Sequence, residues 1–191
     1  MTDGSAAEQE FDVKRDRLVI LASSLGTVFE WYDFFIYGTL AALLGRMFFQ
    51  VESVTLAFLL SLATFAVGFL VRPLGAVLFG YLGDRVGRKY TFLVTITVMG
   101  LATAAIGVLP TYAQIGVAAP LILVALRFAQ GLALGGEYGG AAIYVAEHAP
   151  THRRGFYTSW IQIAVVGGFL LSIIVVVSTT AIVGKDAFEA W

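Results

Sequence analysis

Two acidic residues within the first long apolar stretch are the side chains of this sequence best suited to chemistry. Glu30 and Asp33 lie in the segment GTVFEWYDFFIYG, and Tyr37 follows them at the spacing i, i+3, i+7. That spacing places the three side chains along one face of a helix. An ionised carboxylate is costly inside a bilayer, so these acids are expected to face protein or water and to mark a functional site. Because apolar surroundings favour the neutral form of a carboxyl, either acid is suited to take up and release a proton.

A second polar set lies in the later segment RFAQGLALGGEYGGA. The guanidinium of Arg127 is permanently charged and matches a carboxylate bidentately, so it is a candidate ligand for an anion. Glu137 lies about 15 Å further along the same helix, and therefore needs a partner on another helix or in a cavity. Gln130 and Tyr138 are weaker candidates, because amides and phenols also join helices to one another.

A structural role is the alternative for the same charges. One of the two acids could pair with Arg127 or with Arg72, and that ion pair would only hold neighbouring helices together. Arg72 itself, which precedes Pro73, either lines a cavity or extends its side chain to the membrane surface. The sequence leaves these alternatives open. The aromatic residues around Glu30 and Asp33 are expected to pack against lipid or protein.

The helices that must position these side chains follow from the apolar composition. The 191 residues are 59% hydrophobic and 13% charged, with a mean hydropathy of +0.85, whereas soluble domains are roughly 45–50% apolar and about 25% charged. A bilayer-spanning helix needs roughly 20 mostly apolar residues, and about five segments meet that requirement. Barrel strands are excluded because they are only about 10 residues long. The chain is therefore predicted to be an all-α integral membrane protein, with residues 18–183 forming a bundle of spans at about 18–45, 53–82, 90–109, 120–146 and 156–183.

Basic residues predict the orientation of these spans. Cytoplasmic loops carry an excess of Lys and Arg, and most of the 12 basic residues fall on one side of the predicted membrane. That side carries Lys14, Arg15, Arg17, Arg85, Arg88, Lys89, Arg153 and Arg154, and the other side carries Arg46 and Lys185. We therefore expect residues 1–17 to be cytoplasmic and residues 184–191 to lie outside, in a multi-pass protein of the cell membrane.

The segment GYLGDRVGRK between the second and third spans is more particular than an ordinary cytoplasmic loop. Gly87 permits a tight reversal, and Asp84 can pair with Arg88 or accept hydrogen bonds from a helix N-terminus. The spacing G-x-x-x-D-R-x-G-R-K resembles the signature loop of the major facilitator superfamily. That resemblance implies a gating loop, with its acid in contact with a helix of the C-terminal half of a transporter. The residues concerned are Gly80, Asp84, Arg85, Gly87, Arg88 and Lys89.

Further segments restrict the resemblance to one family within this superfamily. GTVFEWYDFFIYG, VRPLGAVLFG and RFAQGLALGGEYGGA are together similar to the bacterial metabolite:proton symporter family, over almost the whole chain after residue 17. The resemblance implies symport of protons with a small organic acid or a zwitterionic metabolite. Members of that superfamily have about twelve spans in two six-span halves. The ending KDAFEAW looks like the approach to a sixth span, so we expect an N-terminal fragment that lacks its C-terminal half and is inactive alone.

Glycines in the predicted fourth span have a different expected role. Gly131, Gly135 and Gly139 recur every four residues, a spacing that lets helix backbones approach closely in lipid. We therefore assign them to helix packing and not to ligand binding.

Other function classes are disfavoured by what the spans lack. The sequence has no cysteine, and His148 and His152 lie in a polar stretch, so no nucleophile or metal set for an intramembrane enzyme is expected, and no cofactor. A net charge of −1 does not favour nucleic acid. The predicted partners are the lipid bilayer, protons and a small-molecule substrate. A membrane sensor and a truncated remnant that no longer transports remain as alternatives.

Overall fold

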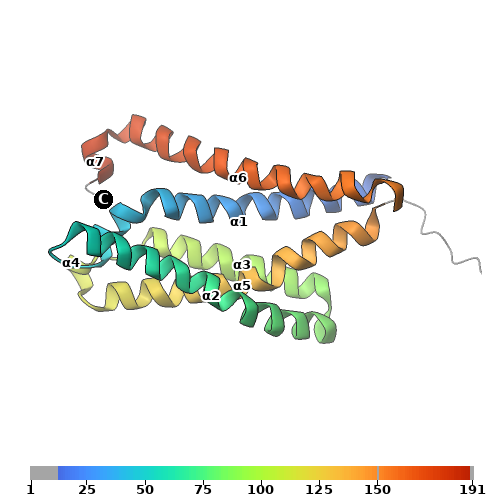
Figure 1. Cartoon of the computed structure of the whole chain (residues 1–191), viewed down its shortest axis with the longest axis horizontal. Helices are drawn as coiled ribbons and strands as arrows, with labels where there is room; N and C mark the ends of the chain where they lie inside the picture. Colours follow the sequence, from blue (N-terminus) through green and yellow to red (C-terminus); the bar gives the residue numbers. More distant parts are fainter. Residues whose placement is uncertain (1–12, 150, 190–191) are drawn as a thin grey trace, which may run out of the picture.

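The chain folds into a bundle of long, antiparallel helices (Figure 1). The computed structural model describes residues 13–149 and 151–189, with side chains for residues 24–87, 90–136, 149 and 152–188. The long helices are α1 (Val13–Phe48), α2 (Val54–Val86), α3 (Arg88–Gly107), α5 (Ala118–His148) and α6 (Arg154–Val183). The short helices are α4 (Tyr112–Ile115), the 3-10 turn η1 (Thr151–Arg153) and α7 (Lys185–Glu189).

Most of the long helices are long and apolar enough to cross a membrane. Among the described residues, these spans are Val54–Val86, Tyr90–Gly107, Ala118–Gly136 and Arg154–Val183. The remaining long helix, α1, has 36 residues, but its side chains before residue 24 lie outside the described part. Only 22% of the apolar window of α2 or of α6 is buried inside the bundle, so these helices present apolar side chains outward. The predicted all-α membrane class is confirmed.

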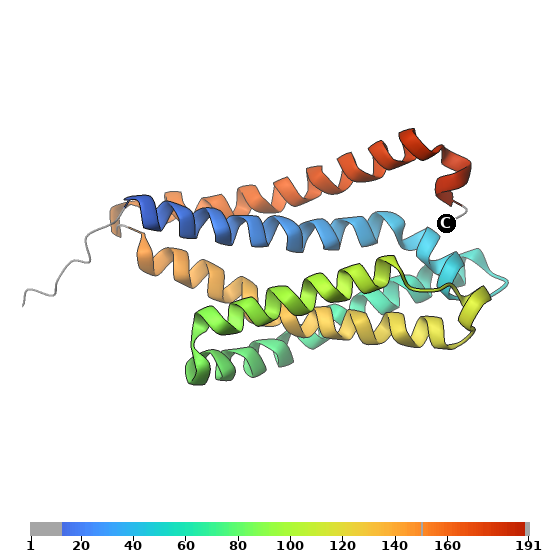
Figure 2. The same cartoon turned by 180° about the vertical axis from the view of Figure 1, so that it is seen from behind.

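The helices form two groups that lie side by side. α1 packs along α6, while α2 and α3 pack along α5, and Figures 1 and 2 show α1 and α6 as one layer over the other three helices. α1 also contacts α2 and α5. The side chains that project from α1 towards α2, α3 and α5 therefore join the two groups.

Glycines allow the closest helix approaches in both groups. A Cβ atom on Gly131 would overlap the backbone of Gly68, and one on Gly135 would overlap the backbone of Arg72. In the other group, a Cβ on Gly168 of α6 would lie 2.6 Å from the carbonyl oxygen of Val28. Gly139, the third glycine of the predicted packing set, lies outside the residues whose side-chain surroundings are described.

The signature segment differs from the expected loop. α2 continues to Val86 and α3 begins at Arg88, so only Gly87 interrupts the helices. Gly87 has φ = 106°, a conformation that side chains with a Cβ rarely adopt. A Cβ on Gly80 would meet no atom within 4 Å, so packing within the described chain does not require a glycine there.

The break between the third and fourth spans also begins and ends earlier than expected. α3 ends at Gly107, and α4 follows with a capping box formed by Thr111 and Gln114. α5 begins at Ala118, which places Pro120 inside its first turn instead of before the helix. Proline is tolerated there because the first N–H groups of a helix have no partner within the helix.

Candidate functional site

Asp33 of α1 lies at the junction of the two helix groups. Arg127 Nη1 of α5 donates a hydrogen bond of 2.8 Å to Asp33 Oδ2, and the two side chains are each 7% exposed. Thr103 Oγ1 of α3 donates to Asp33 Oδ1 at 3.1 Å. Gln130 Nε2 lies 3.3 Å from the same oxygen and donates to Thr103 Oγ1 at 2.7 Å. One carboxylate of α1 thus binds side chains of both α3 and α5.

Tyr37 extends this network one turn further along α1. Its ring lies under the guanidinium of Arg127, with 3.8 Å from Cζ to the ring centroid. The ring of Tyr37 also stacks nearly parallel to the ring of Phe65 of α2, with 5.2 Å between the two centroids. The hydroxyl of Tyr37 donates to the carbonyl oxygen of Ser61 at 3.2 Å. The side chain of Tyr37 is therefore held by contacts with α2 and α5.

Glu30 lies on the same face of α1 and is 3% exposed. The guanidinium of Arg72 lies over the ring of Phe69, 4.2 Å from the centroid. The sequence left open which acid pairs with which arginine. The structure pairs Asp33 with Arg127, and it places Arg72 beside a cavity.

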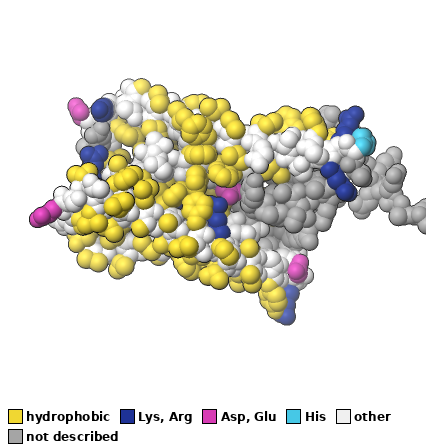
Figure 3. Space-filling view, viewed as in Figure 1, with side chains coloured by type: hydrophobic (Ala, Val, Ile, Leu, Met, Phe, Trp, Pro, Cys, Tyr) yellow, Lys and Arg dark blue, Asp and Glu magenta, His cyan; other side chains and the backbone are white. Residues whose placement is uncertain are grey.

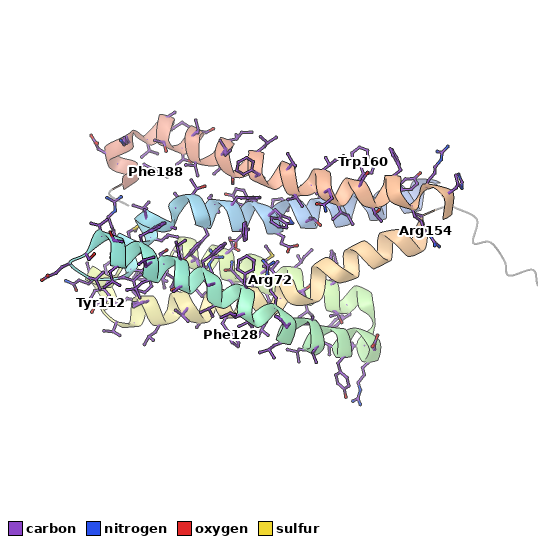
Figure 4. The ribbon with its side chains drawn as sticks, in the orientation of Figure 1. Arg72, Tyr112, Phe128, Arg154, Trp160 and Phe188 are labelled. Atoms are coloured by element: carbon purple, nitrogen blue, oxygen red, sulfur yellow. The ribbon has the colours of Figure 1, made fainter. Side chains whose placement is uncertain are left out.

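This cavity lies between α1, α2 and α5, next to the Asp33–Arg127 pair. About 20 Å³ of it is free, roughly the space that one water molecule needs. In Figure 3, charged side chains of both signs interrupt the apolar surface midway along the molecule, where Figure 4 labels Arg72. The lining residues are Asp33, Phe34, Phe65, Gly68, Phe69, Arg72, Arg127, Gln130, Gly131 and Leu134.

Thr103 was missed by sequence reasoning. It lies in a stretch without charges, and several threonines of α3 look equivalent in the sequence. Thr91 and Thr97 donate to carbonyl groups of their own helix turn, whereas Thr103 donates to Asp33 across the bundle. No local signal separates these threonines, because the difference depends on which of them faces α1.

The residues that the sequence predicts to form a gating loop lie apart from this network. Asp84 and Arg85 are exposed near the end of α2, roughly 18 Å along the helix from Arg72. The guanidinium of Arg85 lies 4.5 Å above the ring of Tyr81. The side chains of the predicted site residues Glu137, Tyr138, Arg88 and Lys89 lie outside the described part of the chain.

The chain is similar to bacterial metabolite transporters along most of its length. It is 45% identical over 175 residues to a proline/betaine transporter of Salmonella typhimurium, and these residues make up 92% of this chain and 35% of the relative. It is 44% identical over 180 residues to a glycine betaine/proline/ectoine/pipecolic acid transporter of Dickeya dadantii, 94% of this chain and 36% of that one. It is 45% identical over 185 residues to a shikimate transporter of Escherichia coli, 96% of this chain and 42% of that one.

The chain thus spans well under half of the length of these relatives, between 35% and 42%. No solved structure matches it. Residues 18–191 match the sugar (and other) transporter family. The match covers every described span. A family of transporters, and not of enzymes, agrees with a membrane bundle that contains a buried ion pair. The chain belongs to the sugar (and other) transporter family of the major facilitator superfamily.

Proposed function

We propose that this chain is the N-terminal part of a symporter that couples protons to the uptake of a small metabolite. In this mechanism Asp33 binds the coupling proton and Arg127 binds an anionic group of the substrate. The observation that carries the proposal is the buried ion pair between these two residues, with 2.8 Å between Arg127 Nη1 and Asp33 Oδ2. The relatives, which transport proline and betaine or shikimate by their names, support a carboxylate-bearing substrate.

The pair supplies a physical reason for coupling. While Asp33 is ionised, it neutralises Arg127, and the guanidinium has no need of another anion. Protonation of Asp33 removes that charge and leaves a buried guanidinium uncompensated, which costs several kcal/mol. A substrate carboxylate then offsets this cost by binding Arg127 bidentately. Proton and anion therefore bind together, which is symport. An antiporter would require that the two exclude each other.

Glu30 and Tyr37 complete the proposed site. Glu30 provides a second buried acid on the same face of α1. Tyr37 holds the guanidinium of Arg127 by its ring face. Gln130 and Thr103 fix the orientation of the Asp33 carboxylate through their hydrogen bonds. We assign Asp33 to proton binding because its ionisation decides whether the charge of Arg127 is neutralised.

The proposed orientation places the N-terminus in the cytoplasm. The described basic residues near the helix ends support it. Figure 1 shows that α1 begins at the same end of the bundle where α2 ends and α6 begins, and this end carries Arg85, Arg153 and Arg154, whereas the other end carries Arg46 and Lys185. Lys and Arg are retained on the cytoplasmic side. In this orientation the exposed Asp84 lies at the cytoplasmic surface, available to a helix of a second half.

Alternating access moves one half of such a transporter against the other. Because the chain spans 35% to 42% of its relatives, we expect the 191 residues alone not to accumulate substrate. Uptake by cells that express only these residues checks this expectation, with a full-length relative as the positive control. Accumulation above background would contradict it.

The coupling proposal is tested by Asp33→Asn in the complete gene product, reconstituted in proteoliposomes. Asparagine resembles the protonated carboxyl in shape and cannot release a proton. We expect loss of uptake driven by a proton gradient, with retained exchange of labelled for unlabelled substrate. Glu30→Gln is the matched variant and is expected to keep part of the gradient-driven uptake. Normal proton-driven accumulation by Asp33→Asn would overturn the proposal, and substrate binding without any transport by the unmodified protein would favour a sensor.

A further inference from the structure

Ser61 of α2 uses its hydroxyl differently from other buried hydroxyls of the bundle. Its side chain is 0% exposed. The hydroxyls of Thr64, Thr95 and Ser172, which are also buried, donate to carbonyl groups of their own helices, as serine and threonine within helices often do. Ser61 Oγ instead donates to the hydroxyl of Tyr37 of α1 at 3.3 Å. A buried hydroxyl that binds a side chain of another helix is a candidate for a specific role.

The contact between Ser61 and Tyr37 is reciprocal. The hydroxyl of Tyr37 donates to the carbonyl oxygen of Ser61 at 3.2 Å, and it accepts from the hydroxyl of the same residue. The phenolic oxygen lies on the axis about which the tyrosine ring rotates, so rotation of the ring does not move it. The two hydrogen bonds therefore fix the direction in which the Tyr37 side chain points, but not the plane of its ring.

Phe65 restrains the plane of the same ring. It follows Ser61 by four residues, so both side chains lie on one face of α2. The rings of Phe65 and Tyr37 are stacked, with 7° between their planes, and rotation of the Tyr37 ring about its axis would break this stack. A tyrosine side chain has two torsion angles that place its ring. Ser61 and Phe65 together therefore restrain both torsion angles of Tyr37.

The ring that α2 restrains is the one that contacts Arg127. The guanidinium of Arg127 lies over the ring of Tyr37, with 3.8 Å from Cζ to the centroid. A cation is attracted by the face of an aromatic ring and not by its edge, so this contact depends on the orientation of the ring. Arg127 Nη1 donates to Asp33, whereas Arg127 Nε has no hydrogen-bond partner in the described part of the chain. Asp33 and the ring of Tyr37 are thus two separate contacts that hold the guanidinium.

We propose that Ser61 and Phe65 are positioning residues that act through Tyr37 and hold Arg127 in place when Asp33 is protonated. The inference rests on the proposed function, in which protonation of Asp33 makes Arg127 available to an anionic group. A guanidinium that has lost its carboxylate could adopt other rotamers, and an anion would then have to order it again at a cost in entropy. The restrained ring of Tyr37 keeps the guanidinium ordered, so this cost does not arise when the anion binds.

The test observes Arg127 directly and needs no substrate. The complete gene product with Asp33→Asn represents the protonated state, and its arginines are labelled with 15N for NMR in detergent micelles. The signal of the Arg127 Nε–H group is identified by its absence when Arg127→Lys is added. Protons over the face of an aromatic ring are shifted upfield, so the signal in Asp33→Asn should lie upfield of its position in Asp33→Asn with Tyr37→Leu. Equal positions in these two proteins would overturn the proposal, because Arg127 would have left the ring.

Ser61→Ala, added to Asp33→Asn, tests the restraint on the direction of Tyr37. An average hydrogen bond between membrane helices changes an equilibrium by about 3-fold, so this variant should lose a measurable part of the upfield shift. Ser172→Ala is the matched control, because Ser172 is 1% exposed and its hydroxyl donates within α6, and it should keep the whole shift. Tyr37→Phe should lose as much as Ser61→Ala, and the two changes together should lose no more than either alone. An unchanged shift in Ser61→Ala, or an equal loss in Ser172→Ala, would refute the role of Ser61.

Phe65→Leu, in the same Asp33→Asn background, tests the restraint on the ring plane. Leucine keeps most of the apolar volume and removes the ring that stacks on Tyr37, so the Arg127 signal should again lose part of its upfield shift. Phe128→Leu is the matched control, because Phe128 of α5 is 43% exposed and does not line the cavity (Figure 4). It should leave the signal where it is. A signal that does not move in Phe65→Leu would refute the role of Phe65.

The positioning role and the symport proposal fail in distinguishable ways. Proton-driven uptake that is lost in Asp33→Asn, together with an Arg127 signal that Ser61→Ala and Phe65→Leu do not move, would leave the symport proposal standing and refute the positioning role. Normal proton-driven uptake in Asp33→Asn would refute the coupling role of Asp33. If the Arg127 signal still moved in Ser61→Ala and Phe65→Leu, these residues would position Arg127 for a task other than proton coupling, and the inference as stated here would be refuted as well.

Discussion

Two acid–arginine sets among the described residues have opposite surroundings. In the centre, Asp33 and Arg127 are buried and 2.8 Å apart. Gln130 and Thr103 also donate hydrogen bonds to Asp33. At the end of α2, Asp84 and Arg85 are both exposed, and Arg85 lies over Tyr81. The two sets have the same residue types, so their difference is one of environment.

Environment decides what each set can do. Water screens the charges at the end of α2, and exposed ion pairs contribute only about 0–1 kcal/mol. Such groups can exchange partners at little cost, which suits a gate that opens and closes. Charges in the buried centre cannot lose a partner without a large cost. In the proposed mechanism, that cost allows the protonation of Asp33 to control the binding of an anion to Arg127.

Loss of the buried arginine is expected to have the largest effect. Arg127→Ala leaves Asp33 as an uncompensated buried charge, so we expect destabilisation of about 3–5 kcal/mol and no measurable proton-driven uptake. Arg85→Ala, at the exposed end, should leave the thermal unfolding temperature unchanged within error. Thermal unfolding in detergent compares the two variants. The double variant Asp33→Asn with Arg127→Ala should recover part of the lost stability, and failure to do so would show that charge is not the cause.

Glycine substitution extends the comparison to packing. Gly131→Val would drive a side chain into the backbone of Gly68, whereas the Cβ of Gly80→Val would meet no atom within 4 Å. Separation of α2 from α5 would also displace Gln130 and Arg127. We therefore expect Gly131→Val to lower the unfolding temperature by several degrees, since overpacking costs roughly 1–3 kcal/mol, and Gly80→Val to change it little. A stable Gly131→Val protein would mean that the helices can separate without penalty.

The smallest effect is expected at Thr103. Thr103→Val keeps the shape of the side chain and removes the hydroxyl that donates to Asp33 and accepts from Gln130. Arg127 and Gln130 still donate to the Asp33 carboxylate, and one typical hydrogen bond contributes about 0.5–1.5 kcal/mol, so proton-driven uptake by the complete gene product should fall by no more than about 10-fold. Thr103→Ser restores the hydroxyl and should restore the uptake. Unchanged uptake by Thr103→Val would exclude Thr103 from the coupling site.

The sequence alone determined the class of the protein and several of its central residues. Long apolar stretches require helices in a bilayer, and the helical period places Glu30, Asp33 and Tyr37 on one face. All three are buried in the structure, at 3%, 5% and 1% exposure. The cost of charge in a membrane also singled out Arg127, because it too interrupts an apolar stretch.

Only the tertiary structure decided which of these residues meet. The partners of Asp33 are 70, 94 and 97 residues away along the chain, and their contact depends on the relative rotation and register of three helices. The periodicity of the sequence is a local property, so it specifies neither the rotation nor the register of one helix relative to another. For the same reason the sequence did not reveal Thr103 or the contact of Phe34, Phe65 and Phe69 with one another beside the cavity. Phenylalanines are common in lipid-facing helices, and only packing shows which of them surround a charged cavity.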